Sequence, residues 1–280
     1  MVSMNRLPET KRVQVVKALV EGNSIRATVR MTGVAKNTVA KLLVELGTTC
    51  SEYQDDALRG LACRRLQADE IWAFCHSKAA NVPADHKGEF GYGDVWTWVA
   101  IDADTKLVPS WLVGDRGGAD AKAFVSDLAD RMANRVQLTT DGYHLYLDAV
   151  EDAFGPDIDY AMLQKIYGAE DGQRRYSPPE CIGVRARRVQ GNPDPAHVST
   201  SYVERQNLTM RMGMRRFTWL TNGFSKKAEN LVAAVSLHFM FYNFARPHKT
   251  LANPYPRTPA MAAGVTDHVW TVEELVGLLG

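Results

Sequence analysis

The chain has 280 residues, of which 45% are hydrophobic, and a formal net charge of +1 at pH 7. This length suits one large domain or two unequal ones, and no run of about 18 uncharged apolar residues offers a membrane span. The start lacks an apolar signal core and the four cysteines form no CxxC pair, which argues against secretion, a zinc ribbon or a disulfide framework and predicts a reducing, cytoplasmic location.

The small net charge conceals an uneven distribution along the chain. Residues 1–49 hold eight Lys/Arg against three Asp/Glu, residues 50–173 hold eleven against 22, and residues 174–260 hold fourteen against four. Two basic segments on either side of an acidic one predict a polyanionic partner that is contacted at two places. The alternative is that the three segments fold together and neutralise one another.

The first 49 residues have the pattern of short helices. Apolar residues share one face of residues 8–22, and Ser24 can cap a second helix that ends at Gly33. A third helix over residues 34–47 has polar and basic residues toward its start, namely Lys36, Asn37, Thr38 and Lys41. This pattern predicts a helix-turn-helix whose third helix contacts DNA. The alternative is a small helical bundle used for packing or dimerisation.

The middle of the chain alternates strands and helices. Residues 50–65 read as a connecting helix or linker, and strand-like runs follow at 66–75, 94–105 and 106–114. A helix at 119–134, a strand at 135–142, a helix at 143–155 and a strand at 159–168 complete the order. This order predicts an α/β domain with a mixed sheet.

The last third begins with an irregular stretch. Residues 169–197 carry four Pro, three Gly and five Arg, and we expect a long loop there. A helix containing Glu204 follows, then an apolar helix over 226–244, a proline-rich segment over 245–264 and a short helix over 271–279.

Three distant carboxylates are candidates for one site. Asp69 lies within the first strand, Asp141 ends the fourth, and Glu204 begins the helix after the loop. Gathered together, they would repel one another unless a cation lay among them, and oxygen ligands suit Mg²⁺ or Mn²⁺. Two such ions stabilise the entering and leaving oxygens of a phosphoryl displacement. From the charge pattern alone, Glu204 can equally form an ion pair with Arg205 or Arg211.

Four segments in order resemble one protein family. They are "ADEIWAF" (68–74), "TTDGYHLY" (139–146), "STSYVERQNLTMRMGMRRFTW" (199–219) and "YNFARPHKTL" (242–251). The chain resembles bacterial insertion-sequence transposases of the DDE superfamily, and most closely those of a small insertion element first described in enteric bacteria. The resemblance covers most of residues 65–260.

The resemblance implies an RNase H-like catalytic domain and a metal-dependent enzyme that cleaves and joins DNA strands. It implies that Asp69, Asp141 and Glu204 form the catalytic triad and bind two Mg²⁺ or Mn²⁺ ions. The residues that we expect to hold DNA phosphates around this site are Arg205, Asn207, Arg211, Arg215 and Arg216. The expected partners are the ends of the element, the target DNA and further copies of the chain. Members of that subgroup often have a cysteine-pair zinc motif before the helix-turn-helix, and none is present here, so we expect no zinc.

These inferences combine into one predicted organisation. Residues 1–49 form the DNA-binding domain, 50–64 a linker, 65–260 the RNase H-like domain, and 261–280 a tail with a short helix. We expect the protein in the bacterial cytoplasm with the nucleoid, without membrane contact. The alternatives are a helix-turn-helix regulator with an inactive RNase H-like domain, and a nuclease without strand transfer.

Other candidate ligands are weaker on sequence grounds. Glu70 adjoins Asp69, but neighbouring strand residues point to opposite faces, and the motif favours Asp69. Asp102 and Asp104 fit a turn better than a metal site. His144 follows Asp141 by three residues and fits a surface or structural role better than contact with the site.

Overall fold

A six-stranded mixed sheet forms the centre of the computed structural model, which describes residues 6–168, 181–218 and 222–280. The strands are β1 (Arg65–Cys75), β2 (Gly93–Asp102), β3 (Ser110–Gly114), β4 (Val136–Asp141), β5 (Ile158–Tyr167) and β6 (Cys181–Gln190). Their order across the sheet is β3-β2-β1-β4-β5-β6. Strands β1, β4 and β5 are parallel, whereas β2, β3 and β6 are antiparallel to their neighbours.

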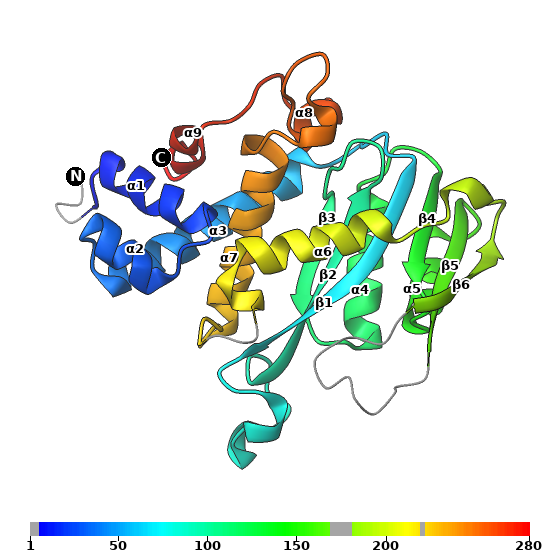
Figure 1. Ribbon diagram of the computed structural model, residues 1–280, viewed down its shortest axis with the longest axis horizontal. Coiled ribbons are helices and arrows are strands. Elements are labelled where there is room, and N and C mark those ends of the chain that lie inside the picture. The colour runs from blue at the N-terminus through cyan, green and yellow to red at the C-terminus, as the bar shows by residue number, and fades with distance from the viewer. Residues whose placement is uncertain (1–5, 169–180, 219–221) are drawn as a thin grey trace.

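Helices cover both faces of the sheet (Figure 1). One face packs against α4 (Gly118–Asp130) and α5 (Leu145–Phe154), and the other against α6 (Ser201–Gly213) and α7 (Ala228–Met240). The π-helical turn Phe241–Ala245 continues α7. The predicted fold class, an α/β fold with a mixed sheet flanked by helices, is confirmed.

Alternation along the strands explains the two apolar layers. On β1, Leu66 and Ala68 belong to the core on the α4 and α5 side, whereas Ile71 and Ala73 belong to the core on the α6 side. Side chains alternate between the faces of a strand, so a strand buried on both sides reads as nearly continuous apolar sequence. This is the pattern from which the strand was predicted.

Three helices precede the sheet: α1 (Glu9–Val20), α2 (Ile25–Thr32) and α3 (Lys36–Ala57). The Ser24 side chain accepts a hydrogen bond from the Ala27 N–H at 3.1 Å, and Gly33 ends α2 at φ 71°. Both caps agree with the sequence prediction. The three helices are confirmed, and their action as a DNA-binding helix-turn-helix remains a prediction.

Helix α3 is longer than the sequence indicated. Gly47, where we predicted its end, lies in the middle of α3, which packs closely on α7. A Cβ atom placed on Gly47 would lie 2.5 Å from the Ala233 carbonyl oxygen. The glycine therefore permits close helix packing and does not mark a helix end. The predicted boundary between the first domain and the linker falls inside α3, and the domain limits remain a prediction.

The expectation of a loop across residues 169–197 is wrong for its second half. Residues 181–190 form β6, which pairs with β5 from Tyr160↔Gln190 to Tyr167↔Cys181. Residues 169–180 lie outside the described parts. Most β6 side chains are exposed, so the strand lacks the apolar alternation by which strands are recognised. Backbone pairing with β5 forms it instead.

Two smaller features complete the fold. Lys106, at the start of the predicted third strand, lies in a turn at φ 64°, and its N–H donates to the Asp102 carbonyl at 2.9 Å. The strand β3 therefore begins only at Ser110.

The chain ends with α8 (Pro259–Ala262) and α9 (Val272–Gly277). Helix α9 begins with a Thr271–Glu274 capping box and contacts α1. No helix in the described ranges has the length and apolar character needed to cross a membrane.

Candidate metal centre

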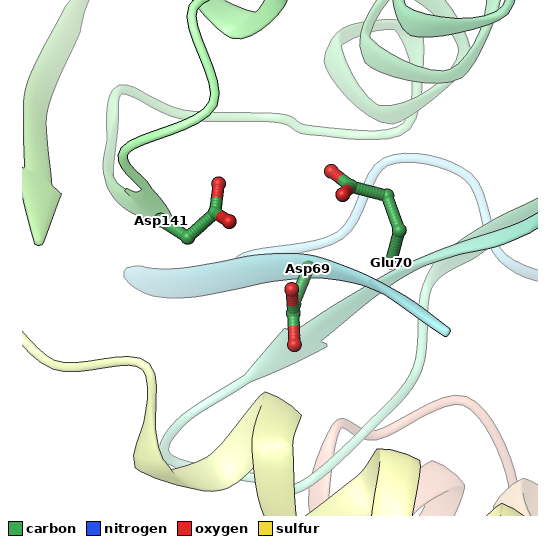
Figure 2. A group of neighbouring side chains, drawn as sticks. All are labelled: Asp69, Glu70 and Asp141. Carbon is green, nitrogen blue, oxygen red and sulfur yellow. The ribbon is translucent and has the colours of Figure 1, made fainter. Parts of the chain in front are cut away.

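Parallel pairing of β1 and β4 brings two carboxylates close together, although Figure 2 shows them directed to opposite sides of β1. Ala68 is paired with Thr140, and the next residues on the two strands are Asp69 and Asp141. Each has a carboxylate oxygen within 4.8 Å of the other and of one on Glu70. Figure 2 shows Asp69 directed toward α6 and Glu70 directed to the other side of β1.

The start of α6 is fixed on β1 beside this cluster. The Gln67 side-chain oxygen accepts hydrogen bonds from the Tyr202 and Val203 N–H groups at 2.8 and 3.2 Å. Further along α6, the Asn207 amide donates to Asp69 at 2.9 Å. Backbone N–H groups in the first turn of a helix have no partner within it, so Gln67 both satisfies two of them and sets the position of α6 over Asp69.

Glu204 lies one helical turn before Asn207 but outside the 4.8 Å cluster. Its carboxylate accepts from Lys165 Nζ at 2.5 Å and from the Thr200 hydroxyl at 2.5 Å. Its negative charge still contributes to raising the pKa of Asp69. The structure thus brings Asp69 and Asp141 together. Glu204 lies near them, and its carboxylate is held by Lys165 on β5.

Glu70 has its own cation. Arg116 donates to the Glu70 Oε2 atom from Nη2 at 3.0 Å and from Nε at 3.2 Å. The guanidinium lies over the rings of Trp96 and Tyr143, at 4.6 and 4.1 Å from their centroids. The buried Oε1 atom of Glu70 has no hydrogen-bond partner among the described residues, so Glu70 stays a candidate ligand beside Asp69 and Asp141.

The charges around the site do not balance. Four carboxylates lie here: Asp69, Glu70, Asp141 and Glu204. Among the described residues, two cations pair with them: Arg116 with Glu70 and Lys165 with Glu204. If all four acids are ionised, two negative charges remain without a partner. One divalent cation would neutralise them.

Asp69 is one carboxylate of this group whose pKa is raised by both burial and the neighbouring negative charges. Burial, followed by the charges of Glu70 and Asp141, raises its pKa to about 7. The buried Asn207 Oδ1 atom next to it has no hydrogen-bond partner among the described residues. Carboxylate and amide oxygens are the ligands that Mg²⁺ and Mn²⁺ prefer. The donor set therefore fits the metal that the sequence resemblance implied.

The raised pKa of Asp69 predicts a pH-dependent stability in the absence of metal. Between about pH 4 and pH 7 the folded state retains a proton that the unfolded state has lost, so the free energy of unfolding falls as the pH rises. Urea titrations with a chelator at pH 5 and pH 8 should show wild type losing roughly 1–3 kcal/mol more than Asp69→Asn. Equal losses in both proteins would contradict a buried, uncompensated Asp69.

The other candidate ligands have structural partners or lie at the surface. Asp102 is buried, and its carboxylate accepts from the Thr105 N–H and hydroxyl at 2.9 and 2.6 Å. Asp104 forms an ion pair with Arg65. His144 is exposed and directly precedes α5. The turn interpretation of Asp102 agrees with these contacts.

The predicted DNA-contacting residues differ in exposure. Exposed side chains are Lys36, Asn37, Thr38 and Lys41 on α3, together with Arg205 and Arg215. Arg211 is half-buried. Arg216 donates to the Ser225 hydroxyl at 2.5 Å, and burial lowers its pKa to about 10. Asn207 is only 5% exposed and is bound to Asp69. The exposed group is placed to meet DNA without rearrangement, and the DNA contacts of all these residues remain predictions.

Lys165, Arg116 and Thr200 were not predicted from the sequence as residues of this site. Thr200 precedes Glu204 by four residues, a spacing that brings side chains together on a helix and offers a signal. Lys165 and Arg116 carry no such signal, because their partners are 39 and 46 residues away. These pairs become visible only when the elements are packed together in the folded chain.

Comparison with known proteins gives no close relative. The chain matches no protein-family model and no curated protein. Among solved structures, the Mos1 strand transfer complex is 12% identical with a TM-score of 0.25, and the alignment covers 57% of this chain and 59% of that one. A piggyBac transposase synaptic complex with hairpin DNA is 9% identical, with a TM-score of 0.37 and coverage of 97% and 70%.

A third structure, the Mos1 mariner paired end complex with Mn, is 12% identical with a TM-score of 0.29 and coverage of 86% and 77%. The chain thus spans about three fifths of the Mos1 chain in the first comparison. All three TM-scores are below 0.5.

Proposed function

We propose that this chain is a transposase that uses Mg²⁺ or Mn²⁺ to cleave DNA at the ends of a bacterial insertion sequence and to join those ends to target DNA. The observation that supports this most is the juxtaposition of Asp69 and Asp141 among four carboxylates with which two cations pair in the described part of the chain. The four sequence segments that resemble DDE transposases include both residues and Glu204.

Each residue has a defined part in this proposal. Asp69 and Asp141 hold the metal, and Asn207 orients Asp69 through its 2.9 Å hydrogen bond. Glu204 completes the ligand set from α6. Bound ions supply activation of a water or 3′-hydroxyl and stabilisation of the leaving oxygen. Arg205 and Arg215, both exposed, hold phosphates of the strand that is cut.

The first turns of α3 supply the second DNA contact. Lys36 and Lys41 are exposed there. The double variant Lys36→Ala/Lys41→Ala should bind duplex DNA about tenfold more weakly at moderate salt, with a salt dependence reduced by about two phosphate contacts. Fluorescence anisotropy at several salt concentrations measures both quantities.

Lys122→Ala is the matched control, because Lys122 lies on α4 and pairs with Asp152 at 2.6 Å. Its affinity and salt dependence should equal those of wild type. An unchanged salt dependence in the double variant would remove α3 from the DNA-binding surface.

The reaction itself is tested with a supercoiled plasmid that carries the DNA flanking the gene. With Mg²⁺ or Mn²⁺, we expect cleavage at the element ends and products joined to new DNA. Binding without cleavage would favour a regulator with an inactive RNase H-like domain. Cleavage without joining would favour a nuclease. Because two ends are handled together, we propose that a homo-oligomer acts, in the bacterial cytoplasm on nucleoid DNA.

A further inference from the structure

Lys165 lies on the face of the sheet that α6 covers, the face toward which Asp69 is directed in Figure 2. It belongs to β5, and its ammonium group contacts Glu204 on α6. The side chain of Lys165 therefore extends along that face toward α6.

The contact between Lys165 and Glu204 is short and partly sheltered. Lys165 Nζ lies 2.5 Å from Glu204 Oε2, with side-chain exposures of 31% and 37%. Burial alone would lower the pKa of Lys165, but the hydrogen bond to Glu204 and the charges of Glu204 and Asp69 raise it. The ammonium group thus lies directly against Glu204, one of the three triad residues.

This position makes Lys165 a competitor for Glu204. One carboxylate oxygen is bound by the lysine and the other by Thr200. Each oxygen keeps a second lone pair, but the two contacts hold Glu204 outside the cluster of Asp69 and Asp141. Lys165 thus competes with a metal ion for the position of Glu204 as well as for its charge. Once it is separated from Glu204, the ammonium group of Lys165 can donate hydrogen bonds to a phosphate oxygen next to the site.

We propose that Lys165 is an internal counter-ion that holds Glu204 while no divalent ion is bound, and that it moves to a phosphate of the DNA when Glu204 turns to the metal. This inference rests on the proposed function. It makes Lys165 a positioning residue that couples metal binding to DNA binding. Mn²⁺ and DNA should then each strengthen the binding of the other.

The first test measures Mn²⁺ binding by electron paramagnetic resonance without DNA. Lys165→Met removes the competitor, so it should bind Mn²⁺ about three- to tenfold more tightly than wild type. Lys165→Arg keeps a cation and should remain near wild type, as should the distant control Lys122→Met. Circular dichroism verifies that each variant is folded.

Simple loss of a positive charge would also strengthen Mn²⁺ binding, and a double-mutant cycle separates the two causes. In a Glu204→Gln background, Lys165→Met should change the Mn²⁺ affinity by less than twofold, because the contact that it breaks is already weakened. An equal effect in both backgrounds would overturn the inference.

The second readout is the coupling with DNA. In wild type, a duplex of flanking DNA should strengthen Mn²⁺ binding, and Lys165→Met should reduce that gain at least threefold. If Asp69→Asn abolishes Mn²⁺ binding while Lys165→Met neither tightens it nor reduces the coupling, this inference fails and the proposed function stands. If wild type binds no Mn²⁺, both fail.

Discussion

Replacing Asp69 or Asp141 by asparagine should lower the rate of metal-dependent strand cleavage at least about a thousandfold. The two carboxylates lie within 4.8 Å of each other, and each supplies negative charge that an amide does not. Gel assays of plasmid nicking with Mg²⁺ or Mn²⁺ measure the effect. Binding of DNA through α3 and the exposed arginines should remain within a few fold of wild type.

Asp148→Asn is the matched control for these variants. Asp148 lies on α5, is exposed, and undergoes the same change of charge. Its cleavage rate should equal that of wild type. If Asp69→Asn cleaved DNA as fast as Asp148→Asn, the carboxylate pair would have no catalytic role.

Replacing Gly47 by alanine should destabilise the protein by about 2–3 kcal/mol, despite the better helix propensity of alanine. The added Cβ would lie 2.5 Å from the Ala233 carbonyl oxygen and 2.6 Å from its Cα. Backbone atoms cannot rotate away, so α3 and α7 must separate. Urea unfolding measures the change in free energy.

Thr48→Ala is the control on the same helix, since Thr48 is exposed next to Gly47. It should change the stability by less than about 0.5 kcal/mol. A Gly47→Ala protein as stable as Thr48→Ala would show that α3 does not pack on α7 as described. The first three helices would then be held on the sheet domain differently.

Local signals in the sequence predicted most of the fold. Ser24 and Gly33 delimit α2 because capping chemistry depends on neighbouring residues only. The runs that became β1, β2, β4 and β5 are apolar because both sheet faces are covered. These patterns are present within ten or so residues, so no knowledge of tertiary contacts is needed.

Non-local contacts explain the errors. Gly47 has the residue type of a helix end, but its role depends on Ala233, far away in the sequence. The exposed β6 forms because β5 offers an unpaired edge, and its own side chains give no strand pattern. In both cases a distant partner decides the local structure.

The candidate site was predictable in part. Alternation along β1 predicted that Asp69 and Glu70 point to opposite sides of the strand, as Figure 2 shows. Both nevertheless lie in one cluster with Asp141, so the choice of Asp69 over Glu70 as a ligand remains a prediction. The pairing of Glu204 with Lys165 was hidden, because it depends on how α6 lies against β5. Glu204 does form an ion pair, but its partner Lys165 is on another element and is not one of the arginines that the charge pattern offered.

The central claim is that Asp69 and Asp141 jointly bind a divalent ion. Anomalous diffraction from Mn²⁺-soaked crystals of the wild-type protein and of Asp141→Asn tests it most directly. We predict a Mn²⁺ peak within bonding distance of oxygens from both residues in wild type and no peak there in the variant. Mn²⁺ bound elsewhere, or the same peak in Asp141→Asn, would contradict the assignment of this site.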